Sequence, residues 1–214
     1  VAILSGDYLF AKAFRIVSEM PHMEYLKIFS HIITCLVEGE FMQMEDVYRI
    51  DQGIDRYMTK TQKKTADFME GCMELGGLLG GWSSDEIMYL KRYGHALGMA
   101  FQITDDIMDY RETSDTTGKP VGNDLREGLL TYPLLSIVNE SNQNQLLQDI
   151  KNLNHGGNEQ EIIDYVIAQG GIDNTLRVAQ QYCDDALSAL QSIRDFDGKE
   201  FLVLAVQNLA DRKV

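Results

Sequence analysis

The sequence predicts an all-α protein, and two observations support that prediction. Prolines are rare, because Pro21, Pro120 and Pro133 are the only three in 214 residues. The long segments between them repeat apolar residues at the three- and four-residue spacing of amphipathic helices. No stretch alternates apolar and polar residues as a half-buried strand does. One helical domain over residues 1–214 is the simplest organisation, since no linker or change of composition divides the chain.

The expected helices follow one another with turn signals between them. They span residues 2–19, 23–44, 47–79, 84–110, 124–140, 142–153, 159–169, 172–193 and 198–211. Pro21 separates the first two helices, and Ser84 can cap the start of the fourth. Residues 111–123 make the longest polar loop. The helical rhythm begins abruptly at Val1, so we expect the sequence to start inside an element of a longer protein.

Charge and cysteine content exclude several classes of function. The formal net charge is −14, and no basic cluster is longer than KTQKK, which argues against binding to nucleic acid or anionic lipid. No apolar run approaches the roughly 18 residues of a spanning helix, and no signal peptide opens the chain. Three widely separated cysteines indicate neither a disulfide framework nor a zinc site. We therefore expect a soluble protein of the reducing cytoplasm.

Three aspartates interrupt the mostly apolar stretch FQITDDIMDY, residues 101–110. On a helix, Asp105 and Asp109 share a face about 6 Å apart, and Asp106 lies one step round. Oxygen ligands without His or Cys suit Mg²⁺, which keeps several waters and is often completed by substrate phosphates. A solvated acidic face is the common alternative. The apolar neighbours favour the metal site, because buried like charges need a cation.

Lysines on both sides of this stretch are candidate partners for a diphosphate. Lys119 lies in the polar loop, and Lys63 and Lys64 lie upstream in KTQKKTADF. A solvated lysine is the alternative for each of them. Gln102 could bind substrate or cap a neighbouring helix. The histidines have no carboxylate or cysteine at metal-binding spacing, so core or surface roles are expected for His22, His31, His95 and His155.

Four stretches occur in a specific order: GDYLFAKAF, KKTADF, GMAFQITDDIMDY and TGKPVGNDLREGLLTYPLL. Together they closely resemble the trans-polyprenyl diphosphate synthases, also called isoprenyl diphosphate synthases, and in particular their medium- and long-chain bacterial members. The resemblance runs from Val1 to the C-terminal LVLAVQNLADRK. It implies an isoprenoid synthase-type helical bundle around a central apolar cavity, here lacking its N-terminal helices.

The resemblance implies a Mg²⁺-dependent prenyltransferase. In this family an allylic prenyl diphosphate ionises, isopentenyl diphosphate attacks the carbocation, and a proton is lost. Repetition elongates an all-trans polyprenyl diphosphate, for example for a quinone side chain. The implied partners are these two diphosphates and a second subunit, in a homodimer or a heterodimer, with delivery of the product to a membrane.

The resemblance also assigns roles to individual residues. The implied metal-binding acids are Asp105, Asp106, Asp109 and Asp124, with Asp105 a direct ligand, Asp109 acting through water and Asp124 in the outer shell. The implied substrate-binding residues are Lys64, Thr65, Gln102 and Lys119. Catalysis is assigned to Asp105, Asp106, Lys64 and Lys119.

Two departures from the family pattern leave alternatives open. The family's first aspartate-rich motif lies upstream of GDYLFAKAF and is not in this sequence, so two of three metals lack their protein ligands and this chain by itself could be inactive. Leu129 stands where many members have a lysine. The leading interpretation is the C-terminal two-thirds of such an enzyme. The alternatives are a non-catalytic regulatory or partner subunit of a heteromeric prenyl synthase, and, less favoured, a terpene cyclase.

Overall fold

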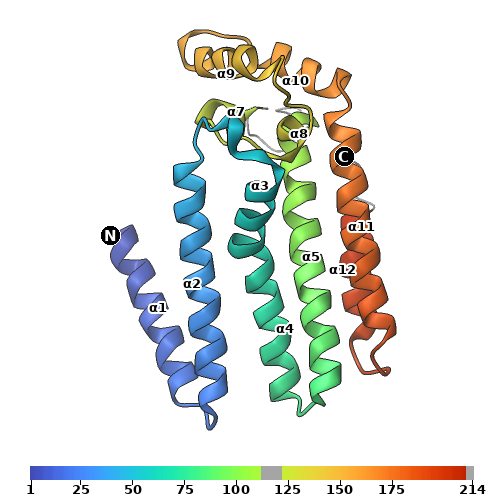
Figure 1. Cartoon of the computed structure of the whole chain (residues 1–214). Coiled ribbons are helices and arrows are strands. Elements are labelled where there is room, and N and C mark those ends of the chain that lie inside the picture. Colours follow the sequence, from blue (N-terminus) through green and yellow to red (C-terminus); the bar gives the residue numbers. More distant parts are fainter. Residues whose placement is uncertain (112–121, 211–214) are drawn as a thin grey trace.

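A computed structural model describes residues 1–111 and 122–210 of the chain. Every regular element within these ranges is a helix, which confirms the all-α prediction. The core of the molecule is a row of long helices, with α5 (Ser84–Arg111) packed between α4 (Asp67–Leu79) and α11 (Gly171–Gln191) (Figure 1). The central position of α5 explains why its aspartate-rich end is surrounded by other elements.

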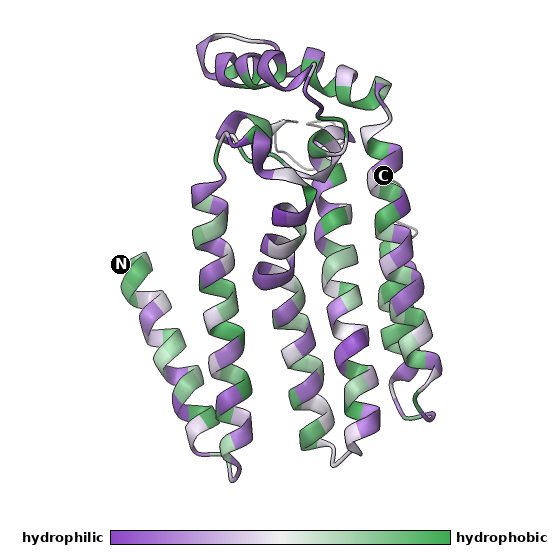
Figure 2. Ribbon diagram, in the orientation of Figure 1, coloured by the Kyte–Doolittle hydropathy of each residue, from purple (hydrophilic) through white to green (hydrophobic). Residues whose placement is uncertain are grey.

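The remaining long helices extend this row on both sides. On one side, α2 (Met23–Glu45) packs against α4, and α1 (Ala2–Ser18) lies beyond it at the edge. None of the α1 residues is buried, although many of them are apolar (Figure 2). On the other side, α12 (Lys199–Ala210) packs against α11.

Short elements cover one end of the long helices (Figure 1). They are α7 (Asn123–Glu127), α8 (Tyr132–Leu135), α9 (Gln143–Asn152), the 3-10 turn η3 (Leu153–His155) and α10 (Glu159–Ala168). The larger cluster of buried side chains joins this cap to the C-terminal half of α5, where Ile103 and Ile107 are fully buried. A second cluster, including Tyr93 and Leu190, joins α5 to α11 and α12.

The expected helix over residues 47–79 is interrupted. It begins with the 3-10 turn η1 (Ile50–Gln52) and continues as α3 (Gly53–Thr61), the π-helical segment η2 (Gln62–Ala66) and then α4. Glycines of both neighbouring helices touch the backbone of η2. A Cβ atom on Gly39 of α2 would lie 2.8 Å from the Lys64 backbone nitrogen. A Cβ atom on Gly98 of α5 would lie 2.6 Å from the Ala66 Cα atom. These contacts join residues that are far apart in the sequence, so the helical spacing of apolar residues could not predict them.

Two further boundaries differ from the sequence prediction. The expected helix over residues 124–140 is divided into α7 and α8, because Gly128 takes a left-handed backbone conformation with a φ of 75° and ends α7. The start of α5 is capped by Ser83 and not by Ser84. The Ser83 hydroxyl accepts from the Glu86 backbone N–H at 3.4 Å, and Ser83 donates to the Glu86 carboxylate from its hydroxyl at 2.8 Å and its backbone N–H at 3.1 Å.

Two further features of the structure concern membrane-spanning helices and the state of the cysteines. In the part of the chain that the structure describes, none of the helices has the length and apolarity needed to cross a membrane. The three cysteines are free thiols, with Cys35 and Cys183 buried and Cys72 exposed.

Candidate functional site

A cavity of about 280 Å³ opens beside the C-terminal half of α5. It lies between that helix, the α3–η2 segment and the turn that follows α7. Its described lining is mostly polar and comprises Gln43, Tyr57, Lys60, Thr61, Lys64, Gln102, Asp105, Asp106, Asp124, Leu129, Leu130 and Thr131. Residues from five separate stretches of the sequence therefore meet at one place.

Asp106 is the buried acid of this cavity, with 4% of its surface exposed. Its Oδ2 atom accepts a hydrogen bond from the Tyr57 hydroxyl at 2.5 Å, and its Oδ1 atom accepts one from the Gln102 Nε2 atom at 3.0 Å. Burial raises the pKa of Asp106 to about 7, and the charges of Asp124 and Asp105 add to the increase, while the two hydrogen bonds oppose it. The carboxylate is thus placed where its charge is costly.

The other two acids of the lining differ from Asp106 in exposure. Asp105 is exposed and Asp124, from α7, is half-buried. Three carboxylates on one small cavity repel one another, and a bound cation removes that repulsion. Their donor atoms are all oxygens, with no imidazole or thiol in the lining. Such a donor set fits a hard divalent ion such as Mg²⁺.

Asp109 does not line the cavity. Its Oδ1 and Oδ2 atoms accept hydrogen bonds from the backbone N–H groups of Asn123 at 3.0 Å and Asp124 at 3.1 Å, at the start of α7. Burial raises the pKa of Asp109 to about 7, and the charge of Asp124 contributes to the increase. The carboxylate therefore positions the backbone from which Asp124 reaches the cavity.

Two lysines of the α3–η2 segment bring positive charge to the cavity. Lys64, from η2, donates to Gln43 Oε1 at 3.0 Å and pairs with Glu40 at 2.9 Å. Lys60, from α3, is 8% exposed and donates to Gln52 Oε1 at 3.3 Å. Burial lowers the pKa of Lys60. The cavity thus has an acidic wall and a basic wall.

Two other sequence-predicted residues form a chain of hydrogen bonds into the acidic wall. The Thr65 hydroxyl donates to Gln102 Oε1 at 3.0 Å, and the same amide donates to Asp106 through its nitrogen. Gln102 lines the cavity, whereas Thr65 touches it through Gln102. Lys63 forms an ion pair with Glu38 of α2 and is not part of the lining. Lys119 lies outside the described residues.

Sequence reasoning missed part of the α3–η2 wall, namely Tyr57, Lys60 and Thr61. A signal was available, since these residues precede Lys64 by seven, four and three positions, which is the spacing of one helix face. Gln43 and Thr131 had no comparable signal, because they come from distant stretches. With lysines and carboxylates in one lining, the cavity can hold a phosphorylated ligand through its lysines and a divalent cation through its carboxylates.

Comparison with known proteins agrees with this chemistry. The family model described as polyprenyl synthetase matches residues 1–169. Octaprenyl diphosphate synthase of Escherichia coli (strain K12) is 32% identical over 206 residues, which cover 94% of this chain and 64% of that protein. Heptaprenyl diphosphate synthase component 2 of Geobacillus stearothermophilus is 29% identical over 90% of this chain and 60% of its own length. The chain thus spans less than two thirds of these relatives.

Solved structures give the same result. The crystal structure of heptaprenyl diphosphate synthase from Staphylococcus aureus aligns with a TM-score of 0.88 and 27% identity over all of this chain and 67% of that one. A polyprenyl synthase from Caulobacter crescentus CB15, complexed with calcium and isoprenyl diphosphate, aligns with a TM-score of 0.88 and 30% identity over 99% of this chain and 66% of that one. From the shared helical fold and the matched sequence, we conclude that the chain belongs to the polyprenyl synthetase family.

Proposed function

We propose that this chain is part of a prenyltransferase that condenses isopentenyl diphosphate with an allylic prenyl diphosphate and so elongates an all-trans polyprenyl diphosphate. The observation that supports the proposal is a single cavity lined by three carboxylates, Asp105, Asp106 and Asp124, and by two lysines, Lys60 and Lys64. Relatives named for octaprenyl and heptaprenyl products favour a medium or long chain, such as a quinone side-chain precursor. Residues 1–214 would form one helical unit of that enzyme, its C-terminal two-thirds.

Mg²⁺ is the proposed cofactor, held by Asp105, Asp106 and Asp124. When bound, the ion supplies positive charge that stabilises a departing diphosphate. The relative from Caulobacter crescentus contains calcium, another hard divalent ion that prefers oxygen ligands, together with isoprenyl diphosphate. Asp109 serves this site by holding the start of α7, which carries Asp124.

The chain's own residues would bind and orient the diphosphate. Lys64 can exchange its contacts with Gln43 and Glu40 for contacts with phosphate oxygens, because all three groups lie at the cavity or beside it. Gln102 fixes the orientation of Asp106, and Thr65 fixes the amide of Gln102. Lys119 is proposed as a further diphosphate contact.

An assembly of two subunits and a cytoplasmic setting complete the proposal. The exposed apolar side chains of α1 would suit contact with a second helical subunit, in either a homodimer or a heterodimer. The relative from Geobacillus stearothermophilus is named component 2, which describes that enzyme as having more than one component. Three unpaired thiols suit a reducing compartment such as the cytoplasm.

Calorimetric titration of the chain with inorganic diphosphate, with and without Mg²⁺, tests the site. We expect binding that requires Mg²⁺ and that weakens at least tenfold in Asp105→Asn. The matched control is Asp184→Asn, because Asp184 is exposed on α11 and only accepts a hydrogen bond from Gln180 at 2.9 Å. Equal effects of the two substitutions would refute the assignment of Asp105.

The second candidate function is a non-catalytic partner subunit of a heteromeric prenyl synthase, which the component name of one relative favours. A subunit of that kind needs the fold but not the metal site. Absence of diphosphate binding in every condition, with a normally folded chain, would support this alternative against the first.

A further inference from the structure

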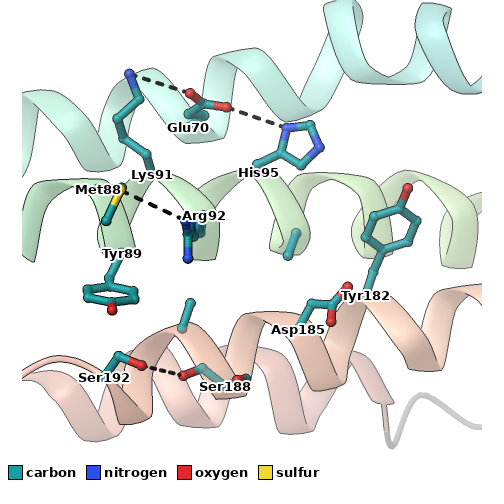
Figure 3. Close-up of a pocket in the computed structure, with 12 residues that line it drawn as sticks. Glu70, Met88, Tyr89, Lys91, Arg92, His95, Tyr182, Asp185, Ser188 and Ser192 are labelled. Atoms are coloured by element: carbon teal, nitrogen blue, oxygen red, sulfur yellow. Dashed lines mark hydrogen bonds and ion pairs between the residues drawn. The ribbon is translucent and has the colours of Figure 1, made fainter. Parts of the chain in front are cut away.

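A second cluster of ligand-type side chains lies between α4 and α5, outside the cavity described above. Asp67 and Glu70 of α4 and His95 of α5 are each half-buried, and each offers one ligand atom within 4.8 Å of the others. The His95 Nδ1 atom lies 3.4 Å from the Glu70 carboxylate (Figure 3). Two carboxylates and one imidazole from two helices therefore converge.

Close backbone packing holds this cluster in place. Gly94 and Gly98 lie on either side of His95 on α5. Gly94 touches the backbone of α4, and Gly98 touches the backbone of η2. A Cβ atom on Gly94 would lie 2.7 Å from the Met69 carbonyl oxygen and 2.9 Å from the Glu70 Cα atom. Because the two helices are in direct contact there, the backbones that carry His95 and Glu70 are held close together. A site built on rigid helices needs little rearrangement to bind an ion.

A third helix, α2, borders the two carboxylates of this cluster. His31 of α2 lines a cavity of about 210 Å³ together with Asp67 and Glu70. The Sγ atom of Cys35, one turn further along α2, lies 3.6 Å from the His31 Nε2 atom. Burial raises the pKa of the Cys35 thiol, and its hydrogen bond with Asp67 contributes to the increase. Asp67 is thus within reach of α2 as well as α5.

The charges around the cluster leave Glu70 available to a metal ion. Lys91 lies 3.5 Å from Glu70 (Figure 3). It lies closer to Glu74, at 2.7 Å. The closer partner of this lysine is therefore Glu74. If a cation takes the place of the Lys91 contact at Glu70, the lysine keeps its stronger ion pair.

We propose that Asp67, Glu70 and His95 bind one divalent transition-metal ion of the Zn²⁺ class, with water as the fourth ligand. An imidazole combined with carboxylates suits zinc, whereas the all-oxygen donors of the first cavity suit Mg²⁺. The ion would join α4 and α5, so it would stabilise the helical bundle. The proposal is independent of the prenyltransferase function, since none of its ligands lines the first cavity.

Titration of the metal-free chain with Zn²⁺ and with Co²⁺ tests the proposal, in excess Mg²⁺ so that the oxygen-only site is filled. Calorimetry gives the stoichiometry, and the visible absorption of Co²⁺ reports its coordination. We expect one ion per chain, at least tenfold weaker binding in His95→Gln and in Asp67→Asn, and a rise in Tm with Zn²⁺ that His95→Gln abolishes.

Two matched variants should bind like the wild type. Cys72→Ser removes the exposed thiol, and Asp105→Asn alters the first cavity. Wild-type affinity in folded His95→Gln, or loss of the ion in Asp105→Asn, would overturn the proposal. If His95→Gln fails to fold, the Co²⁺ titration is repeated on His95→Cys. A charge-transfer band from the new thiolate to Co²⁺ is then expected. Its absence in the folded variant would overturn the proposal.

Discussion

The Tyr57 hydroxyl donates a hydrogen bond of 2.5 Å to the Oδ2 atom of Asp106 and so joins α3 to α5 at the base of the candidate site. Both side chains are buried, with exposed fractions of 2% and 4%. A buried carboxylate that loses its hydrogen-bond donor still bears the free-energy cost of desolvation, because no hydrogen bond offsets that cost.

Tyr57→Phe is expected to lower the free energy of unfolding by about 1–3 kcal/mol, because it removes this donor and little volume. Urea denaturation at neutral pH measures the change. Tyr8→Phe is the control, since Tyr8 is exposed on α1, and it should leave stability within about 0.5 kcal/mol of the wild type. Equal stabilities of all three proteins would show that the hydrogen bond contributes nothing.

Lys64→Ala is expected to weaken Mg²⁺-dependent diphosphate binding at least about tenfold, or roughly 1.4 kcal/mol, because it removes a positive charge from the cavity wall. Lys63→Ala is a matched control on the neighbouring residue. Lys63 pairs with Glu38 and does not line the cavity, so its removal should change the affinity little. Calorimetry distinguishes the two variants, and a larger loss in Lys63→Ala would contradict the assignment.

Lys60 should make stability depend on pH in the alkaline range. Burial lowers its folded pKa below the ordinary value of 10.5, so between the folded and unfolded pKa values the unfolded chain binds more protons. The Lys60 contribution to the free energy of unfolding therefore increases as the pH rises through that window. The difference between wild type and Lys60→Met, measured by denaturation from pH 8 to 11, should grow in favour of the wild type. A flat difference would contradict the lowered pKa.

Gly98→Ala is expected to destabilise the bundle by about 1–3 kcal/mol, because the new methyl group would lie 2.6 Å from the Ala66 Cα atom, in the α4–η2 backbone. Gly76→Ala adds the same methyl group inside α4, where no atom lies within 4 Å. That variant should be neutral or more stable by up to about 1 kcal/mol, since alanine favours a helix. Chemical denaturation compares the two, and equal shifts would refute the close packing of α5.

Ser83→Ala is expected to cost about 1 kcal/mol of stability, because it removes the hydroxyl of the capping box with Glu86. Ser84→Ala removes no hydrogen bond seen in the structure and should cost less. Thermal unfolding of the two variants checks which serine caps α5, and a larger effect at Ser84 would restore the sequence-based prediction.

Local pattern was enough to predict the helices and the aspartate-rich stretch. A helix satisfies its backbone within one segment, so the spacing of apolar residues reports both the helix and its buried face. For that reason the sequence alone determined that Asp105 and Asp106 stand on a largely buried helix near lysines. It also determined the family, because the four matching stretches occur in order.

Tertiary structure decided which side chains meet. Periodicity could place Asp109 on the same helix face as Asp105, but only the position of the α7 backbone turned its carboxylate away from the cavity. The π-helical turn that carries Lys64 is in contact with two glycines from neighbouring helices. His95 has no carboxylate near it in the sequence, yet contact between α4 and α5 brings it to Glu70. These relationships join residues far apart in sequence, so they are set by the packing of whole helices against one another and not by the local pattern of any one of them.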